Sequence, residues 1–285
     1  MGALHRRLAD LGFYYTPVDD VYGKQTERAV SRYQAYLNQL RGLDGAVAER
    51  FPDAISEGGR LTSEQLEYLF SEAYTPYPSV LLVGDEGQAV YRLQLRLDQL
   101  GYLSAAPNGV YGDGTARAVV RFQRRAGLPE TGDADPETQR ALFGSDAPPA
   151  VNPIYHYRLY ISNDEQRVYA YAWSDGGYHR LAREMICSSG LPNTPTSDGV
   201  FRSEGQVSRW CYFPIYGCWA QYAFRIDGGV LFHSVLYDAA NENTLRVSSL
   251  KSLGSKSSHG CVRLTVEDAR WIYENCRAGT TVVVY

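Results

Sequence analysis

The sequence lacks any long hydrophobic run and any long run of charges of one sign. Its 285 residues carry 28 Lys and Arg against 32 Asp and Glu, for a formal net charge of −4. A membrane-spanning helix needs about 20 consecutive apolar residues, and nucleic-acid binding needs a basic stripe. We therefore expect no integral membrane segment and no nucleic-acid partner, and we expect a monomer.

An export signal is also missing from the start of the sequence. Met1 and Gly2 run directly into a helical pattern, without the charged and then apolar stretches of a signal peptide. We therefore expect an N-terminally trimmed chain, whose signal or anchor segment lies outside this sequence.

Cysteine is scarce, and its number is odd. The five cysteines are Cys187, Cys211, Cys218, Cys261 and Cys276. At least one thiol is therefore free, whatever the others do. Cys211 and Cys218 flank a short aromatic loop, and the sequence fits either a disulfide between them or two buried thiols.

The first half of the chain contains an internal repeat with an offset of 89 residues. Residues 6–34 align without a gap on residues 95–123, sharing R-L-x-x-L-G-[FY] and then V-Y-G-x-x-T-x-R-A-V-x-R-[FY]-Q. An offset this long is typical of two copies of a small domain rather than of a solenoid. The boundaries that we predict are 1–75 for the first copy and 84–146 for the second.

Each copy is predicted to form three helices. Val90, Leu93, Leu97 and Leu100 form one apolar stripe, and Gly101 then ends the helix. Asp135-Pro136 begins the third helix of the second copy, with aspartate as N-cap and proline at the first helical position.

In the first copy, Thr62 and Gln65 form a capping box for the third helix, which follows a longer insert at residues 41–60. His5 aligns with Gln94, and we expect it on the surface.

The repeat resembles the peptidoglycan-binding domain family, small three-helix modules with G-x-Y-G…T…A-V…F-Q at their centre. The second copy matches this pattern well. The first is looser and lacks the "GDEGQAV" that opens the second. The resemblance implies peptidoglycan glycan strands as a partner, while generic helical bundles that pack on a neighbouring domain remain an alternative.

The pattern changes to β after a linker at residues 144–153, which is rich in proline and small residues. Residues 155–173 alternate around a turn at Asn163-Asp164, which predicts a hairpin. "GGVLFHSVLY" and "TTVVVY" predict further strands, and a helix follows Thr265. The predicted fold is multidomain, with two all-α modules followed by a mainly-β, sandwich-like domain with one or two helices at residues 152–285.

The stretch "SHGCVRL" at residues 258–264 raises the question of a reactive thiol. A cysteine nucleophile needs a group that takes its proton or lowers its pKa. Near Cys261, the candidates are His259, Arg263 and the N-terminal dipole of the helix that follows Thr265. Gly260 permits a tight turn whose amides can face an oxyanion.

A second histidine is a better base, because a histidine two residues from a cysteine rarely has suitable geometry. His156 and His179 lie in hairpin-like segments without acidic or thiol neighbours, and we expect structural roles for them. His233 ends the predicted strand "GGVLFHS". A metal site made of His233, His259 and Cys261 is an alternative, but the spacing is not a usual ligand pattern, and we expect no metal or other cofactor.

These residues carry a second resemblance. "FHS" followed by "SHGCVRL", with "CSSGLPNTPTSDGVF" upstream, is similar to the L,D-transpeptidase family over about residues 152–285. Twenty-four residues separate His233 from Ser258, more than in many members, and we expect this extra loop to shape the substrate groove.

The resemblance implies Cys261 as the nucleophile, His233 as the general base and His259 as an assistant. It also implies that the carbonyl of Ser234 orients the imidazole. The amides of Gly260 and Cys261, with His259, are candidates for the oxyanion site, and Ser258 is a candidate for substrate contact or orientation. Arg263 would hold either the loop or a substrate carboxylate.

The predicted function is a cysteine-dependent L,D-transpeptidase that forms 3→3 cross-links between tetrapeptide stems and releases D-alanine. The predicted location is outside the cell membrane, in the cell wall or periplasm, and carbapenems would acylate the thiol. A thiol hydrolase (an L,D-carboxypeptidase that trims stems) shares every catalytic residue and remains an alternative. A non-catalytic wall-binding protein is the second alternative.

Overall fold

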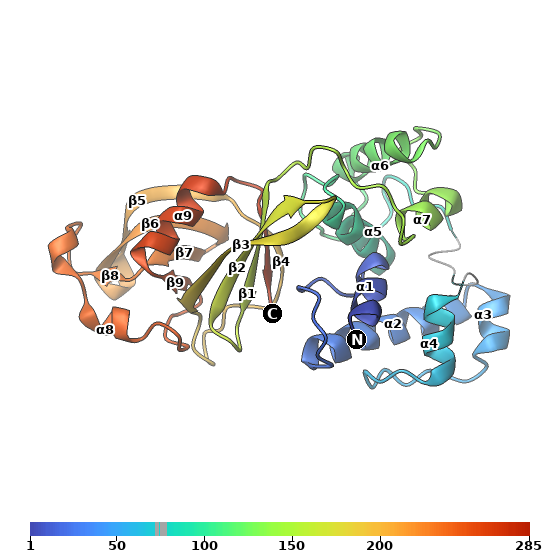
Figure 1. Cartoon of the computed structure of the whole chain (residues 1–285), viewed down its shortest axis with the longest axis horizontal. Helices are drawn as coiled ribbons and strands as arrows, with labels where there is room; N and C mark the ends of the chain where they lie inside the picture. The colour runs from blue at the N-terminus through green and yellow to red at the C-terminus, as the bar shows by residue number, and fades with distance from the viewer. Residues whose placement is uncertain (72–73, 75–78) are drawn as a thin grey trace. The chain divides into compact units, whose positions relative to one another are not determined.

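The computed structural model describes residues 1–71, 74 and 79–285. The chain divides into two compact units, which we call the helical unit (Met1–Ile154) and the β unit (Tyr155–Tyr285). Figure 1 shows helices in the first and a curled sheet in the second. Helices that precede a mainly-β domain are the predicted fold class, which is confirmed.

The helical unit contains both copies of the repeat. Its helices are α1 (Gly2–Asp10), α2 (Lys24–Arg41), α3 (Gly45–Arg50), α4 (Ser63–Phe70), α5 (Gln88–Gln99), α6 (Asp113–Ala126) and α7 (Pro136–Leu142). The first copy comprises α1, α2 and α4, with α3 inside its insert, and the second comprises α5, α6 and α7.

The local signals that begin and end these helices are confirmed. The side chains of Thr62 and Gln65 form a reciprocal capping box at the start of α4. Asp135 accepts a hydrogen bond from the Thr138 amide at the start of α7. Gly101 follows the end of α5 with a φ of 81°, in the left-handed region that glycine adopts at low cost.

The prediction that His5 lies on the surface is wrong. Its side chain is fully buried, with Nε2 2.8 Å from Thr26 Oγ1 and Nδ1 2.7 Å from the Asp19 carbonyl oxygen. The aligned Gln94 bonds the aligned Thr115 in the same way, at 2.9 Å. Both residues therefore form buried hydrogen bonds that connect the first and second helices of their copy.

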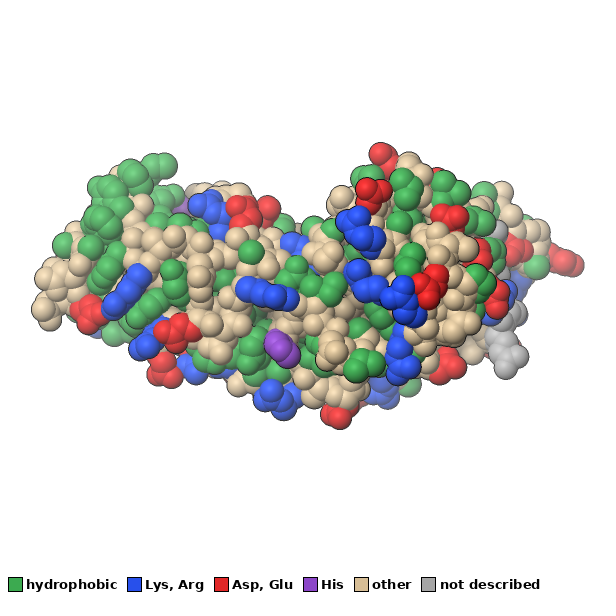
Figure 2. Space-filling model, turned by 90° about the horizontal axis from the view of Figure 1, so that it is seen from above, with side chains coloured by type: hydrophobic (Ala, Val, Ile, Leu, Met, Phe, Trp, Pro, Cys, Tyr) green, Lys and Arg blue, Asp and Glu red, His purple; other side chains and the backbone are tan. Residues whose placement is uncertain are grey.

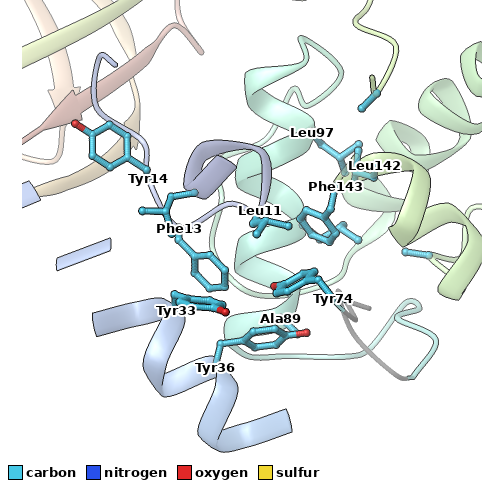
Figure 3. Close-up of a cluster of buried hydrophobic side chains, with 14 of the residues drawn as sticks. Leu11, Phe13, Tyr14, Tyr33, Tyr36, Tyr74, Ala89, Leu97, Leu142 and Phe143 are labelled. Atoms are coloured by element: carbon cyan, nitrogen blue, oxygen red, sulfur yellow. The ribbon is translucent and has the colours of Figure 1, made fainter. Parts of the chain in front are cut away.

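An arginine joins the two copies inside the helical unit. The Arg92 guanidinium of α5 lies 4.7 Å from the ring centre of Phe13, 3.8 Å from that of Tyr36 and 5.0 Å from that of Phe143. Figure 3 shows Phe13, Tyr36 and Phe143 in the cluster of buried side chains that spans both copies. Each buried cation–π contact is worth about 1–2 kcal/mol.

The β unit is one sheet in the order β4-β10-β1-β2-β3-β9-β7-β6-β5, with β8 paired to β6. Its strands are β1 (Tyr157–Ser162), β2 (Arg167–Ser174), β3 (Gly177–Ser188), β4 (Gly199–Arg202), β5 (Gly205–Phe213), β6 (Cys218–Asp227), β7 (Val230–Ser234), β8 (Leu236–Tyr237), β9 (Val262–Leu264) and β10 (Thr281–Val284). The hairpin predicted around Asn163 is the β1–β2 pair.

The sheet encloses one core because it curls. Strand β3 pairs with β2 on one side and, through Cys187 and Ser188, with β9 on the other. Buried residues of both halves, such as Ile161 and Phe232, form one cluster with Ala269 and Ile272 of α9 (Val266–Asn275). The predicted cap of α9 is confirmed, since Thr265 Oγ1 accepts from the Asp268 amide. The sandwich-like core is therefore built from a single continuous sheet.

We predict that Arg92→Leu destabilises the helical unit by about 2–4 kcal/mol, because the aromatic cage loses its cation and Tyr74 loses a hydrogen-bond donor. Denaturant unfolding followed by circular dichroism at 222 nm measures this loss. Arg124→Ala is the control, because its ion pair with Glu130 is exposed to solvent and contributes little to stability. Equal effects of the two substitutions would contradict the role given to Arg92.

Candidate active site

The candidate site lies where strands β7 and β9 run side by side in parallel. Their register places His233 opposite Arg263 and Phe232 opposite Val262. Phe232 and Val262 face the core, so His233, Arg263 and Cys261 share the opposite face, because side chains alternate along a strand. Cys261 therefore lies on the chain segment next to β7. It is displaced from His233 along the strand direction by two residues, or roughly 7 Å.

The backbone of Ser234 fixes the tautomer of His233. Nδ1 of His233 lies 2.7 Å from the Ser234 carbonyl oxygen. A carbonyl only accepts hydrogen bonds, so Nδ1 carries the proton and Nε2 of the neutral ring is the basic nitrogen. The side chain is 3% exposed, and the ring of Phe213 packs against it with centres 5.0 Å apart.

Burial sets the protonation state of both groups. It lowers the pKa of His233 to about 4, against the opposing effect of the hydrogen bond to Ser234. Burial also raises the pKa of the Cys261 thiol, which a hydrogen bond from the backbone of Leu231 and the positive charge of Arg263 offset only in part. At neutral pH, the resting pair is therefore a neutral imidazole and a neutral thiol rather than an ion pair.

The segment upstream of β4 holds the turn that presents Cys261. The amide of Leu191 donates to the Ser258 carbonyl oxygen, and the Thr196 hydroxyl donates to the Gly260 carbonyl oxygen at 2.8 Å. Gly260 has a φ of 111°, which suits glycine alone. The "CSSGLPNTPTSDGVF" segment is thus a support for the cysteine turn.

Of the suggested helpers of Cys261, one is too distant and another is already engaged in a hydrogen bond. The dipole of α9 does not reach the thiol, because β9 lies between them and carries the start of the helix roughly 13 Å away. The Gly260 amide donates to Ser258 Oγ at 3.2 Å, so in this structure it is engaged within the turn. Ser258 Oγ itself donates to the Cys261 carbonyl oxygen.

His259 and Arg263 have different surroundings. The exposed ring of His259 stacks on Tyr216 with centres 4.7 Å apart. Tyr216 belongs to a short 3-10 helix, η1 (Pro214–Tyr216), at the β5–β6 turn. Arg263 Nη1 donates to Ser252 Oγ at 3.2 Å and to Ser257 Oγ at 3.3 Å. The sequence suggested that Arg263 holds either the loop or a substrate carboxylate, and these contacts are with the loop.

The long loop between His233 and Ser258 is partly helical. It contains the 3-10 helix η2 (Glu242–Thr244) and the short helix α8 (Val247–Lys251).

Three large hydrophobic side chains of the β unit are exposed to solvent. They belong to Ile215 and Tyr212, at and near the β5–β6 turn, and to Val247 in α8. Figure 2 shows hydrophobic side chains gathered at the end of the β unit that carries β5, β6 and β8.

Sequence reasoning did not consider an electrostatic effect of Cys211 on Cys261. Cys211 faces Ala220 across the β5–β6 pair, while Cys218 faces Phe213. Both thiols are free, as are the other three. Negative charge on Cys211 would raise the pKa of Cys261. Within the described part of the chain, no group of three His, Cys, Asp or Glu residues is arranged to hold a metal ion, and no helix there could cross a membrane.

Two family models match the chain. Residues 156–284 match the "L,D-transpeptidase catalytic domain". Residues 1–47 and 86–142 match the "Putative peptidoglycan binding domain". The chain carries a peptidoglycan-binding region followed by a catalytic domain of the L,D-transpeptidase family.

Two curated relatives each match about half of the chain. The "Putative L,D-transpeptidase YciB" of Bacillus subtilis is 34% identical over 134 residues, 45% of this chain and 66% of that protein. The "N-acetylmuramoyl-L-alanine amidase CwlM" of Mycobacterium tuberculosis is 32% identical over 144 residues, 50% of this chain and 32% of that protein. The chain thus spans less than two thirds of each relative.

Solved structures resemble the chain more loosely. The structure of the L,D-transpeptidase LdtMt1 in complex with imipenem is 22% identical, over 46% of this chain and 59% of that one, with a TM-score of 0.37. An L,D-transpeptidase of Xylanimonas cellulosilytica is 26% identical, over 74% of this chain and 99% of that one, with a TM-score of 0.33. The family assignment depends on the sequence matches.

We predict that Gly190→Ala disrupts the turn that holds Cys261. A Cβ at Gly190 would lie 2.1 Å from the Thr194 carbonyl oxygen and 2.6 Å from the Thr196 amide. We expect a loss of about 2–3 kcal/mol in the free energy of unfolding of the β unit. All four tryptophans lie in this unit, so their fluorescence during denaturation measures it. Gly229→Ala is the control, because its Cβ would meet no atom within 4 Å.

We predict that the alkylation rate of Cys261 by iodoacetamide rises about tenfold per pH unit between about pH 6 and 8, because only the thiolate reacts and the pKa of the thiol is raised. Mass spectrometry of the peptide that contains Cys261 measures the rate separately from that of Cys211. A plateau over this range would instead reveal a thiolate–imidazolium pair and contradict the neutral resting state.

Proposed function

We propose that the β unit is a cysteine-dependent acyltransferase that acts on peptidoglycan tetrapeptide stems and forms 3→3 cross-links. The observation that carries the proposal is the placement of Cys261 and the basic Nε2 side of His233 on one face of the β7–β9 pair. The family match of residues 156–284 supports the reaction class. The peptidoglycan-binding region supports a site of action in the cell wall or periplasm.

The first half-reaction forms a thioester. His233 Nε2 takes the proton of Cys261 as the sulfur attacks the carbonyl carbon of the third stem residue. The tetrahedral intermediate then breaks its C–N bond, and the imidazolium gives the proton to the departing D-alanine amine. Splitting the exchange into two acyl transfers requires neither ATP nor a metal ion.

The second half-reaction passes the acyl group to an amine. The side-chain amine of a neighbouring stem's third residue attacks the thioester and loses a proton to His233. The C–S bond breaks, and the Cys261 thiolate regains that proton from the imidazolium. Water in place of the amine gives the hydrolase alternative with the same residues.

The remaining residues have supporting roles in the proposal. Cys261 contributes its amide to the oxyanion site, since the Gly260 amide is engaged by Ser258. Ser234 holds the imidazole. Arg263 supports the loop at residues 252–257. His259, exposed beside Tyr216, is available to contact the substrate.

A carbapenem tests the nucleophile, and the imipenem complex of LdtMt1 makes it a suitable probe. We expect intact-protein mass spectrometry to show one covalent adduct, which Cys261→Ala abolishes and the matched control Cys211→Ala retains. His233→Gln should slow adduct formation by about 10²–10⁴-fold, the usual contribution of a general base. An adduct that survives Cys261→Ala would overturn the proposal.

Product analysis separates the cross-linking and trimming activities. Tetrapeptide stems with an amine acceptor should give cross-linked dimer and D-alanine in equal amounts. Release of D-alanine without dimer at every acceptor concentration would favour the hydrolase alternative, and no release at all would favour the non-catalytic wall-binding alternative.

A further inference from the structure

The first repeat carries a hollow beside α2, far along the chain from the cysteine site. It has a volume of about 430 Å³. Its lining consists of Lys24, Glu27, Arg28, Ser31, Arg32 and residues 57–59. We propose that this hollow binds the peptide stem of peptidoglycan, a short peptide that carries both carboxylate and ammonium groups. The proposal rests on the proposed function, in that peptidoglycan is taken as the partner.

The wall of the hollow at residues 57–59 is fixed to the helical unit. Ser31 Oγ donates to the Glu57 carbonyl oxygen at 2.9 Å. The Gly59 amide donates to Gln34 Oε1 at 3.1 Å, and the Tyr22 hydroxyl donates to the Gly59 carbonyl oxygen at 2.6 Å. A wall held in this way loses little conformational entropy when a ligand binds.

Glycine is required where this wall meets the helix. Gly59 has a φ of 71°, and a Cβ there would lie 2.9 Å from the Glu27 carbonyl oxygen. Close approach of the two backbones therefore shapes the hollow, and the side chains of Glu27 and Ser31 are left to determine its chemistry.

Charges of both signs line the hollow. Lys24, Arg28 and Arg32 are basic, while Glu27 and Glu57 are acidic. The Nε and Nη2 donors of Arg32 are engaged by the Phe13 carbonyl oxygen, at 3.1 and 2.8 Å, so Arg32 has a structural role. Lys24 and Arg28 then carry the positive charge that a ligand carboxylate would meet. An arginine recognises a carboxylate through paired donors, and an acidic side chain recognises an ammonium group. This mixture suits a stem peptide, which carries both groups.

The lining suits a peptide better than a glycan. None of the lining residues is aromatic, so the hollow offers no ring face on which a sugar would stack. Its polar groups are charged side chains and backbone, which match the charged groups of a peptide more closely than the neutral hydroxyls of a sugar.

The second repeat has the same scaffold with different chemistry. Gln123 Oε1 accepts from the Gly132 amide, as Gln34 Oε1 does from Gly59. Ala116 and Val120 occupy the positions of Glu27 and Ser31, and a Cβ on Gly132 would touch both. The glutamine and its glycine are 9 residues apart in the second copy and 25 in the first. The longer connection of the first copy supplies Glu57.

The test uses the full chain carrying Cys261→Ala, so that no turnover occurs. We expect the synthetic tetrapeptide L-Ala-γ-D-Glu-L-Lys-D-Ala to shift the amide NMR signals of residues 24–32 and 57–59 in a saturable manner. Arg28→Glu should weaken this binding at least tenfold. Arg117→Glu, at the matching position of the second copy, should leave it unchanged.

Three outcomes would overturn the proposal. Tetrapeptide shifts confined to the β unit would remove the hollow as a site. Equal effects of Arg28→Glu and Arg117→Glu would show that only overall charge matters. Shifts at the hollow with N,N′-diacetylchitobiose, and none with the tetrapeptide, would make it a glycan site.

Failure of this proposal is distinguishable from failure of the proposed function. The second measurement is carbapenem adduct formation on Cys261 in the chain that carries Arg28→Glu alone. We expect the adduct to form at the rate of the unaltered chain, because the hollow lies in the other unit. An intact adduct without stem binding at the hollow overturns only the present inference, whereas an absent adduct in the unaltered chain overturns the proposed function.

Discussion

The parallel pairing of β7 with β9 is the constraint on which the candidate site depends. These two short strands come from segments separated by the long loop at residues 235–257, and only their register brings His233 and Arg263 opposite one another. A slip of one residue would turn Cys261 into the core and bring Val262 out. The buried partners Phe232 and Val262 prevent this slip, because they fill the core between the sheet and α9. Packing on one face thus fixes the chemistry on the other.

Burial gives this site a particular electrostatic character. A thiolate–imidazolium pair requires a thiol whose pKa lies below that of the imidazole. Here burial moves the two pKa values in opposite directions, down to about 4 for His233 and upward for Cys261. Charge therefore has to develop during the reaction, when His233 takes the proton as the sulfur attacks. Such a site keeps its thiol in the unreactive form until a substrate carbonyl is in place.

Local signals in the sequence predicted much of the fold, because a helix cap is specified by residues three positions apart. Thr62, Asp135 and Thr265 are examples. His5 was misjudged because a lone histidine suggests a surface position, although its alignment with Gln94 pointed to a buried hydrogen bond.

For the site, the sequence brought Cys261 and His233 forward as a pair but could not show what surrounds them. Phe213 and Tyr216 come from the β5–β6 turn, and only the curl of the sheet brings them to the histidines. The reach of the α9 dipole was overestimated, since the strand between Cys261 and Thr265 is not evident from three residues.

The two repeats show how one scaffold separates structure from chemistry. Gln34 and Gln123 hold the same glycine turn in both copies, and His5 and Gln94 hold the same threonine. A buried polar group without a partner costs about 1–3 kcal/mol, so a replacement at these positions has to keep the hydrogen bond, as Gln94 does where the first copy has His5. The positions beside them carry no such penalty, so Glu27 and Ser31 in one copy can be Ala116 and Val120 in the other. A difference in ligand between the copies would therefore reside in these permissive positions, while the fold of both stays the same.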